Sequence, residues 1–465
     1  MNRRDFIRKT VYTGALFAGL GLRPLRADTD PEKWRKQSPN DKLNLGFIGT
    51  ANQARFSIDN LKRLGDNFVA AADVDSRFLD KMKSDFPKIE TCTDFRKLLE
   101  RNDLDAVVVA VPDHIHAPAA AMALRNGLHV YCEKPLTHSV FEARTLIELS
   151  QKNKRVTQMG TQIHAEPNYR RVVELVQSGA IGSVNEVHVW CGKGWTDGRF
   201  VKDDKPCPPT LDWDLWLGPA PQHPYQSNIH PANWRKFWDF GGGTLADMGC
   251  HYTDLPFWAL KLKHPDSCWA EGPPVHPDGT PQNLTIHWTF PARGELAAVK
   301  LHWYDGGARP QILSSPEIKG MKEKVRTKDG KELEQPVQWG SGVLFIGDKG
   351  MLLADYGRRK LLPEEKFKDF APPPQSIAAS KGHHAEWINA IKNNGYGAGS
   401  EGNTGANGTT CNFEYSGALS ETILLGNVAF RTGQKLDWDA KELKATNCPA
   451  ADAFIRREYR KGWVL

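Results

Sequence analysis

The sequence predicts an α/β protein in which a doubly wound parallel sheet is followed by a second α/β domain with a large, mainly antiparallel open sheet. Two observations indicate this architecture. From residue 43 to residue 162, solidly apolar runs alternate with helix-like segments, which is typical of buried parallel strands joined by helices. From residue 163 to residue 465, strand-like runs lie closer together and alternate apolar with polar residues, as a sheet with one open face requires.

The expected elements follow from these patterns. In the first block, strands are expected at 43–49, 67–73, 104–112 and 128–132, and helices at 57–65, 76–86, 118–127 and 141–153. In the second block, strands are expected at 184–191, 283–290, 295–304 and 342–355, and flexible loops at 361–376 and 393–408. Fourteen of the fifteen Trp residues follow residue 162, where they can pack the core or stack on sugar rings.

The N-terminus carries an export pattern. Residues 1–27 contain the pair Arg3-Arg4, then Phe-Ile and Lys, and then the apolar run "VYTGALFAGLGL", which resembles the twin-arginine export signal of bacteria. Residues 28–42 are polar and contain proline, as in a linker. The apolar run is too short to span a bilayer, so we expect a periplasmic protein without a membrane anchor. A basic amphipathic start that stays on the protein is the alternative.

The charge balance argues against nucleic acid as a partner. The formal net charge of +6 arises mostly from residues 1–27, which hold six Arg or Lys and one Asp, and the remaining chain carries +1. The eight cysteines lie far apart without a C-x-x-C pair. We therefore expect mostly free, buried thiols, although an exported protein can hold one disulfide.

A dinucleotide-binding turn is expected after the first strand, in "LGFIGTANQA". Gly49, Ala51 and Ala54 occupy the three positions of a G-x-G-x-x-G fingerprint, and Gly46 precedes them in the strand. Asp73 ends the next strand, where a carboxylate accepts hydrogen bonds from both ribose hydroxyls and repels a 2′-phosphate. These residues favour NAD over NADP as the cofactor. An ordinary strand-to-helix turn is the alternative.

Two more segments follow expected strands and belong to the same end of the sheet. "VPDHIHAP" brings Pro112 and His116, and "VYCEKPLTH" brings Glu133 and Lys134. Ligands of open α/β sheets bind outside the carboxyl ends of the strands, so we expect all four residues beside the cofactor. A plain surface turn at Glu-Lys-Pro is the alternative.

The stretch "GGGTLADMGCHYTD" runs three glycines into a helix-like segment with Asp247 and His251 four residues apart. Residues at i and i+4 share a helix face, so the carboxylate and the imidazole can extend into the same region of the protein. Oxidation of an alcohol requires a base for the hydroxyl proton, and histidine titrates nearest neutral pH. A metal site is the alternative, although no third ligand of matching spacing is evident. Another alternative is that the segment is an ordinary capped helix whose histidine packs in the core and has no chemical role.

Together these motifs resemble the Gfo/Idh/MocA oxidoreductases, the group of glucose-fructose oxidoreductase and inositol dehydrogenase. The resemblance runs from "LNLGFIG" through Glu-Lys-Pro and "GGGTLADMGCHYTD" to the closing "LDWD". It implies a Rossmann domain over 43–162 that binds NAD(P). It also implies a C-terminal substrate domain over 163–465, whose open sheet often forms the oligomer interface, and hence a homodimer or homotetramer.

The resemblance also assigns roles. Lys134 fills the family's active-site lysine position, and Asp247 and His251 fill its Asp and His positions. We expect His251 to accept the proton and Lys134 to polarise the substrate oxygen, with roles that can be exchanged, while Asp247 orients the imidazole or binds a neighbouring hydroxyl. Ala51 and Ala54 depart from the family's glycines, which bears on cofactor affinity.

The expected substrate is a sugar or glycoside. Segments "LDWDLWLGPAP" and "NWRKFWDFGGG" look like those of an exported sugar-acting subgroup. The expected substrate-binding residues are Gln162, Trp195, Asn233, Trp234 and Arg235, a mixture suited to stacking a pyranose and hydrogen-bonding its hydroxyls. On the family's behaviour, oxidation at a ring secondary hydroxyl, first of all C3, is expected.

Three activities fit these residues. The first is an NAD-dependent sugar or glycoside dehydrogenase with a tightly bound cofactor, because the periplasm has no useful pool of free NAD. The second is a redox-neutral glycosidase or lyase that oxidises its substrate transiently. The third is a non-catalytic sugar-binding protein, which the joint presence of Lys134, Asp247 and His251 disfavours.

Overall fold

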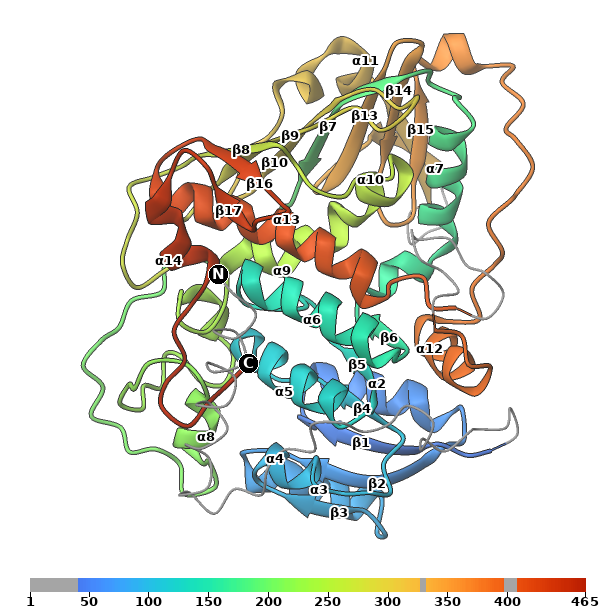
Figure 1. Ribbon diagram of the computed structural model, residues 1–465. Coiled ribbons are helices and arrows are strands. Elements are labelled where there is room, and N and C mark those ends of the chain that lie inside the picture. Colours follow the sequence, from blue (N-terminus) through green and yellow to red (C-terminus); the bar gives the residue numbers. More distant parts are fainter. Residues whose placement is uncertain (1–40, 327–331, 397–407) are drawn as a thin grey trace, which may run out of the picture.

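The first part of the chain forms a parallel sheet, as the sequence predicts (Figure 1). The computed structural model describes residues 41–326, 332–396 and 408–465, so the predicted export signal, most of the linker and most of the glycine-rich loop lie outside the described residues. The strands of this sheet are β1 (Asn44–Ile48), β2 (Asn67–Ala72), β3 (Glu90–Cys92), β4 (Ala106–Val109), β5 (His129–Cys132) and β6 (Thr157–Met159). They stand in the order β3-β2-β1-β4-β5-β6, and every neighbouring pair is parallel.

Helices connect these strands. They are α2 (Gln53–Lys62), α3 (Ser76–Asp85), α4 (Phe95–Leu98), α5 (Asp113–Arg125) and α6 (Val140–Asn153). The start of α6 is fixed by a capping box, in which Ser139 Oγ accepts from the Glu142 N–H and the Glu142 carboxylate accepts from the Ser139 N–H.

Helix α5 begins earlier than its sequence suggests. The expected start was Pro118, but the helix starts at Asp113 and contains Pro118 in its interior. The proline removes one backbone hydrogen bond of the helix. The imidazoles of His114 and His116 each contact two backbone carbonyls of neighbouring segments, so tertiary contacts hold the first turn.

The second sheet has nine strands and is mainly antiparallel, which confirms the predicted fold class. The strands are β7 (Val184–Trp190), β8 (Ser267–Glu271), β9 (Thr285–Phe290), β10 (Val299–Tyr304), β13 (Gly342–Gly347), β14 (Gly350–Ala354), β15 (Arg359–Leu362), β16 (Leu436–Asp439) and β17 (Lys444–Ala445). Their order is β15-β14-β13-β7-β10-β9-β8-β16-β17, and β7 and β10 form a parallel pair. In β9, buried and half-buried residues alternate strictly, so one face of the sheet packs on the core.

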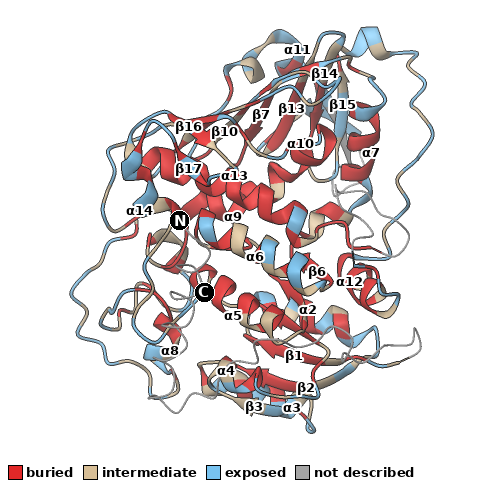
Figure 2. Cartoon of the chain, in the orientation of Figure 1, coloured by how far each residue is buried: buried red, intermediate tan, exposed pale blue. Residues whose placement is uncertain are grey.

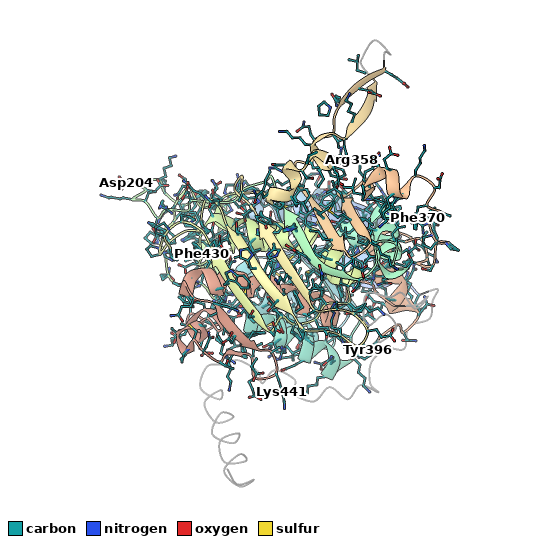
Figure 3. The ribbon with its side chains drawn as sticks, turned by 90° about the horizontal axis from the view of Figure 1, so that it is seen from above. Asp204, Arg358, Phe370, Tyr396, Phe430 and Lys441 are labelled. Carbon is teal, nitrogen blue, oxygen red and sulfur yellow. The ribbon has the colours of Figure 1, made fainter. Side chains whose placement is uncertain are left out.

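The remaining elements surround these sheets. The helices are α7 (Pro167–Gln177), α8 (Trp213–Leu217), α9 (Gly243–Tyr252), α10 (Asp254–Ala259), α11 (Pro316–Lys319), α12 (His383–Lys392), α13 (Phe413–Thr432) and α14 (Asp452–Ile455). The short 3₁₀ turns are η2 (Gln162–Ala165), η3 (Trp234–Lys236), η4 (Gln311–Ser314), η5 (Glu364–Phe367) and η6 (Pro449–Ala451). Strands β11 (Lys322–Arg326) and β12 (Glu332–Pro336) form a separate hairpin that stands away from the body (Figure 3).

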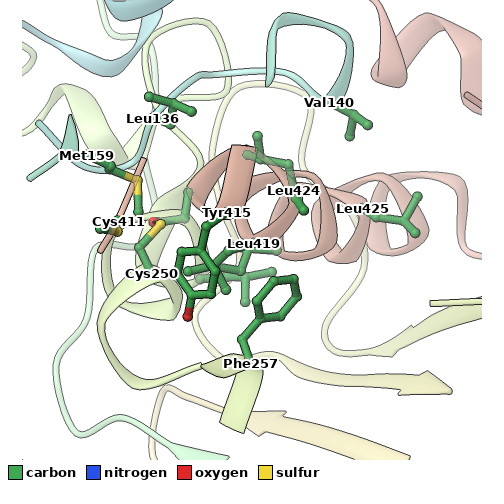
Figure 4. Packing of buried hydrophobic residues seen from close by; sticks show 14 of the residues in the cluster. Leu136, Val140, Met159, Cys250, Phe257, Cys411, Tyr415, Leu419, Leu424 and Leu425 are labelled. Carbon is green, nitrogen blue, oxygen red and sulfur yellow. Dashed lines mark hydrogen bonds between the residues drawn. The ribbon is translucent and has the colours of Figure 1, made fainter. Parts of the chain in front are cut away.

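Helix α13 joins the two sheets. It is buried along nearly its whole length and lies between α6 and the second sheet (Figures 1 and 2). The close-up in Figure 4 shows Tyr415 of α13 beside Cys250 of α9 and Phe257 of α10, and the Tyr415 and Phe257 rings lie 5.6 Å apart. On the other side, the Trp288 indole of β9 donates a hydrogen bond to the backbone of α13. The helix is therefore the common core of both parts.

Two late segments of the chain return to the first sheet. Helix α12 places Trp387 and Ile391 in the apolar core that also contains Phe47 of β1. The C-terminal tail runs back to α5 and α6, where Arg457 pairs with the buried carboxylate of Glu142 at 2.7 Å. The half of the fold that contains the parallel sheet is thus completed by residues far beyond position 162.

The cysteines agree with the prediction of mostly free, buried thiols. All eight cysteines are free thiols, and six of them are buried. Within the described ranges, no helix combines the length and the apolar character needed to cross a membrane.

Replacement of Arg457 tests whether its ion pair with Glu142 holds the C-terminal tail against the first part of the fold. Arg457→Ala should lower the free energy of unfolding by about 3 kcal/mol, because it leaves the buried charge of Glu142 without its partner. Arg456→Ala is the matched control, because Arg456 pairs with an exposed Asp452 and its loss should cost about 0.5 kcal/mol. Urea unfolding followed by circular dichroism measures both values, and equal losses would contradict this role of the ion pair.

Candidate active site

A cavity of about 480 Å³ lies at the carboxyl ends of the parallel strands, where the two parts of the chain meet. The turns after β1, β2, β4 and β5 line one side of it. The other side comes from the second part of the chain, through Trp195, Trp234, Arg235 and Asp247. The site therefore takes its residues from both halves of the fold, as expected of a ligand site in an open α/β sheet.

The turn after β1 is shaped by one required glycine. Gly49 has φ +85°, and a Cβ at this position would lie 2.2 Å from the carbonyl oxygen of Ala110. The turn leads into α2, whose N-cap residue Asn52 makes no side-chain capping hydrogen bond. Asn52 and Gln53 at this helix N-terminus line the cavity, and helix N-termini are favourable sites for phosphate groups.

Asp73 directly follows β2, and three hydrogen bonds fix the position of its carboxylate. Its carboxylate accepts hydrogen bonds from the backbone N–H of Thr50 at 2.9 Å, the Thr50 hydroxyl at 3.0 Å and the backbone N–H of Asp75 at 3.0 Å. Burial raises the pKa of Asp73 above its usual value, although these hydrogen bonds favour the charged form. The helix N-terminus without a side-chain cap and this half-buried carboxylate lie in one cavity, and they fit the pyrophosphate and a ribose of a dinucleotide.

Lys134 extends from the turn after β5 into the cavity. Its turn is held in place by His116, whose ring lies 2.6 Å from the carbonyl oxygen of Pro135 and 2.8 Å from that of Val111. Lys134 Nζ donates to Asp247 Oδ1 at 2.6 Å and lies 3.3 Å from the Asp247 carbonyl oxygen. Asp247 belongs to α9, so this ion pair joins the two halves of the site.

Asp247 is a fixed negative charge. In addition to Lys134, Arg235 Nε lies 2.9 Å from its Oδ1, and the Trp195 indole donates to its Oδ2 at 2.6 Å. Burial alone would raise the pKa of Asp247, but Lys134 and Arg235 outweigh burial and hold this pKa at about 2. The Arg235 guanidinium also stacks over the Trp234 ring, 4.1 Å from its centroid. Asp247 therefore positions cationic side chains and is a poor proton acceptor.

His251 does not titrate near neutral pH, contrary to the expectation from its residue type. Burial and the positive charge of Lys134 lower the pKa of His251 to about 3, so the imidazole is neutral at pH 7. Its Nδ1 is buried and has no hydrogen-bond partner among the described residues. His251 lies on α9 one turn after Asp247, but it does not line the cavity itself.

Glu133 and Gln162 belong to one polar network. Glu133 accepts hydrogen bonds from the Ser57 hydroxyl at 3.0 Å and from Gln162 Nε2 at 3.2 Å. Burial raises the pKa of Glu133 to about 7, although Lys134 favours its charged form. Gln162 lines a separate cavity of about 350 Å³ beside α12 and not the cavity of Lys134. Gln162 thus donates a hydrogen bond to Glu133 but lies outside the cavity of Lys134.

The structure brings together most of the expected residues. Those that line the cavity are Gly49, Ala51, Asp73, Pro112, His116, Glu133, Lys134, Trp195, Trp234, Arg235 and Asp247. Those that do not line it are Gly46, Ala54, Gln162, Asn233 and His251. Gly46 instead packs against the side chains of Leu98 and Leu104, and Ala54 is buried in α2.

Sequence reasoning missed Asp113. This first residue of α5 is 1% exposed, neither of its carboxylate oxygens has a hydrogen-bond partner among the described residues, and Arg235 Nη2 lies 4.0 Å from its Oδ1. Burial raises the pKa of Asp113 to about 7, against the opposing effect of Arg235. An acidic residue directly after the Pro112 turn was the signal that could have revealed it.

Replacement of Asp113 should change how stability depends on pH. The folded-state pKa of about 7 lies above the usual 3.8, so the unfolded chain releases this proton first and stability falls as pH rises from 4 to 7. Asp113→Asn removes this loss. Its free energy of unfolding relative to wild type should therefore grow by about 2 kcal/mol between pH 5 and pH 8. Urea unfolding at both pH values checks this, and a constant difference would contradict a buried carboxyl with a raised pKa.

Two protein-family models match the chain. An oxidoreductase family with an NAD-binding Rossmann fold matches residues 43–161, and the C-terminal α/β domain of the same family matches residues 166–294. Together the two matches cover slightly more than half of the chain. They coincide with the parallel sheet and with the start of the second sheet.

Individual proteins show more limited similarity. Inositol 2-dehydrogenase of Rubrobacter xylanophilus is 31% identical over 147 residues, which are 31% of this chain and 42% of that protein. Alpha-N-acetylgalactosaminidase of Shewanella oneidensis is 24% identical over 203 residues, which are 40% of this chain and 44% of that protein. The chain thus spans less than half the length of these relatives.

A solved structure shows the same fold over more of the chain. The WlbA dehydrogenase from Bordetella pertussis, in complex with NADH and UDP-GlcNAcA, matches with a TM-score of 0.57 at 16% identity, over 86% of this chain and 99% of that one. With both family models matched in order on the two halves of the fold, the chain belongs to the Gfo/Idh/MocA family of oxidoreductases.

Proposed function

We propose that this protein is an NAD-dependent oxidoreductase that acts on a secondary hydroxyl of a sugar or glycoside. The observation that carries the proposal is the Lys134–Asp247 ion pair, which lies in the same cavity as the turn after β1 and the Asp73 carboxylate. Bound NAD supplies a hydride acceptor in such a cavity. The residues of the chain must then bind the substrate oxygen, hold it and move its proton.

Lys134 is suited to hold the substrate oxygen. An ammonium group has three N–H donors, and both hydrogen bonds that Lys134 Nζ makes to described residues go to Asp247. One donor remains for a hydroxyl or carbonyl oxygen. Because oxidation builds negative charge on that oxygen, a fixed cation stabilises the transition state more than the bound alcohol.

His251 is the proposed acceptor of the hydroxyl proton, and in this role the substrate hydroxyl must reach past the cavity lining, which does not include His251. Its imidazole is neutral at pH 7, and its buried Nδ1 has no partner among the described residues. A pKa of about 3 makes this imidazole a weak base. Stabilisation of the developing alkoxide by Lys134 is therefore part of the same step.

The lining from the second part of the chain favours a polyhydroxylated substrate. Trp195 and Trp234 line the cavity, and the Arg235 guanidinium stacks over the Trp234 ring and pairs with Asp247. Aromatic faces beside fixed donors suit the alternating apolar and hydroxylated surface of a pyranose. The inositol 2-dehydrogenase relative points to the same substrate class, and C3 of a glycoside is our first choice of carbon.

A second candidate function is redox-neutral glycoside cleavage through transient oxidation. It is favoured by the similarity to alpha-N-acetylgalactosaminidase of Shewanella oneidensis over 203 residues, a longer match than that to the inositol dehydrogenase. Both functions use the same oxidation step at Lys134. They differ in whether reduced cofactor accumulates.

We also propose the cellular setting that the sequence suggests. The protein would be exported folded through the twin-arginine pathway, with NAD tightly bound, and would act in the periplasm as a homodimer or homotetramer. The Arg3-Arg4 pattern of residues 1–27 supports export. Tight binding would keep the cofactor with the enzyme where free NAD is scarce.

Removal of the Lys134 amine tests the function. Lys134→Met should lower the rate of NAD reduction by about two to four orders of magnitude, because the substrate oxygen loses its cation. Arg235 and Trp195 still contact Asp247, so the variant should fold and bind NAD. The exposed Lys97→Met is the matched control and should keep the wild-type rate.

The measurement is absorbance at 340 nm with a panel of glycosides, with the sugar products followed by NMR. A rise at 340 nm with a keto-sugar supports the dehydrogenase, and cleavage without a net rise supports the redox-neutral function. Full turnover by the Lys134→Met variant would contradict the assignment. Sugar binding without any reaction would indicate a non-catalytic protein.

Replacement of Asp73 tests the choice of cofactor. Asp73→Ser removes a carboxylate that would repel a 2′-phosphate, so the ratio of the Kd for NADP to the Kd for NAD should fall by about tenfold. Fluorescence titration with both nucleotides measures this ratio. An unchanged ratio would mean that Asp73 does not face the ribose.

A further inference from the structure

A row of histidines crosses the second sheet outside the cavity described above. His188 of β7, His302 of β10 and His287 of β9 stand directly opposite one another on neighbouring strands. The next residue of β9, Trp288, donates to the backbone of α13, and successive side chains of a strand point to opposite faces. The histidines therefore lie on the outer face of the sheet, the side that Figure 3 looks onto. Glu186, two residues before His188, shares this face.

Three potential ligand atoms converge in this row. Glu186 Oε1 lies 3.2 Å from His188 Nε2 and 3.5 Å from His302 Nε2. Zinc binds nitrogen and oxygen at roughly 2.0–2.1 Å, so two ligand atoms of a tetrahedral site stand about 3.3–3.4 Å apart. The two separations from Glu186 match this spacing, and all three ligand atoms lie within 4.8 Å of one another.

The other ring nitrogens already have partners. His188 Nδ1 lies 3.1 Å from the Tyr304 hydroxyl oxygen, and His302 Nδ1 lies 2.6 Å from His287 Nδ1. When both Nδ1 atoms carry the proton and donate it, both Nε2 lone pairs face Glu186. Histidines that bind metals characteristically hold their tautomer in this way, through a donor contact at the second nitrogen. His287 continues the chain, because its Nε2 lies 3.4 Å from Glu271 Oε1.

In the single chain, solvent can reach the three atoms. The side chains of His188 and His302 are 11% and 12% exposed, and that of Glu186 is 39% exposed. In contrast, the cluster of His164 and Asp254 is completely buried, and Asp254 is occupied by contacts with His164 and Tyr415. An ion can enter the first group and not the second.

We propose that Glu186, His188 and His302 form a binding site for one Zn²⁺ ion, or a similar divalent transition metal, with water as the fourth ligand. Two imidazole nitrogens and a carboxylate oxygen are a ligand set that zinc accepts, and neither Mg²⁺ nor Ca²⁺ prefers nitrogen. The ion would connect β7 to β10, the parallel pair at the centre of the sheet. None of the three ligands lines the cavity of Lys134.

The test is a zinc titration of the full chain, freed of any polyhistidine tag and stripped with a chelator. Isothermal titration calorimetry should show one equivalent of Zn²⁺ per chain, and Co²⁺ in place of zinc should give the visible absorption of a tetrahedral site. Glu186→Gln and His302→Gln should each weaken zinc binding at least about tenfold. His276→Gln, which removes a histidine outside the row, is the matched control and should bind as wild type does.

Thermal unfolding separates loss of the site from loss of the fold. Zinc should raise the Tm of the wild type and of His276→Gln, and should leave the Tm of Glu186→Gln unchanged. Glu186→Gln is conservative and half-exposed, so it should fold even if His302→Gln does not. No stoichiometric binding by the wild type, or equal affinity in all variants, would overturn the proposal and leave a hydrogen-bonded cluster.

Discussion

The buried negative charge of Asp247 is the interaction on which the site depends. A carboxylate inside a protein costs several kcal/mol unless cations and hydrogen-bond donors compensate it. Here the compensation comes from Lys134 after β5, from Arg235 of η3 and from the indole of Trp195. Each donor belongs to a different segment, so the charge fixes three segments at once. Placement of the Lys134 amine in the cavity follows directly from this arrangement.

The rest of the fold keeps these three segments in fixed positions relative to one another. Helix α13 packs on α6 and on α9, and therefore sets the helix that carries Asp247 against the sheet that carries Lys134. Helix α12 and the C-terminal tail return to the first sheet and close it. Contacts between residues hundreds of positions apart thus determine where the amine and the carboxylate meet. The cavity lies between the two halves because its central ion pair joins them.

Much of this could be predicted from the sequence, because local patterns encode it. The alternation of apolar runs predicted the parallel sheet, and the position of Glu-Lys-Pro after a strand predicted that Lys134 lies at the carboxyl edge. The four-residue spacing of Asp247 and His251 placed both on one helix, as observed. Gly49 was identifiable from its fingerprint position after the first strand, and its φ of +85° shows why a glycine stands there.

Properties set by tertiary surroundings could not be predicted. The pKa of His251 depends on burial and on Lys134, which is 117 positions away in the chain. The local pattern shows that Asp113 follows the Pro112 turn, but its burial without a hydrogen-bond partner depends on what packs around the start of α5. Gly46 shares the glycine signal of Gly49, yet it faces leucine side chains, because the direction of each strand residue is set by the sheet. From residue type alone, one would expect an ordinary pKa for His251 and Asp113 and an ordinary turn position for Gly46.

The most direct test of the account is a double-mutant cycle between Lys134 and Asp247. Single-turnover rates of NAD reduction would be measured for Lys134→Met, Asp247→Asn and the double variant. If Asp247 acts by holding the Lys134 amine, the double variant should be no slower than Lys134→Met alone, because the second change has nothing left to remove. If the two losses instead multiply, Asp247 contributes independently of Lys134, and the central role of the ion pair is contradicted.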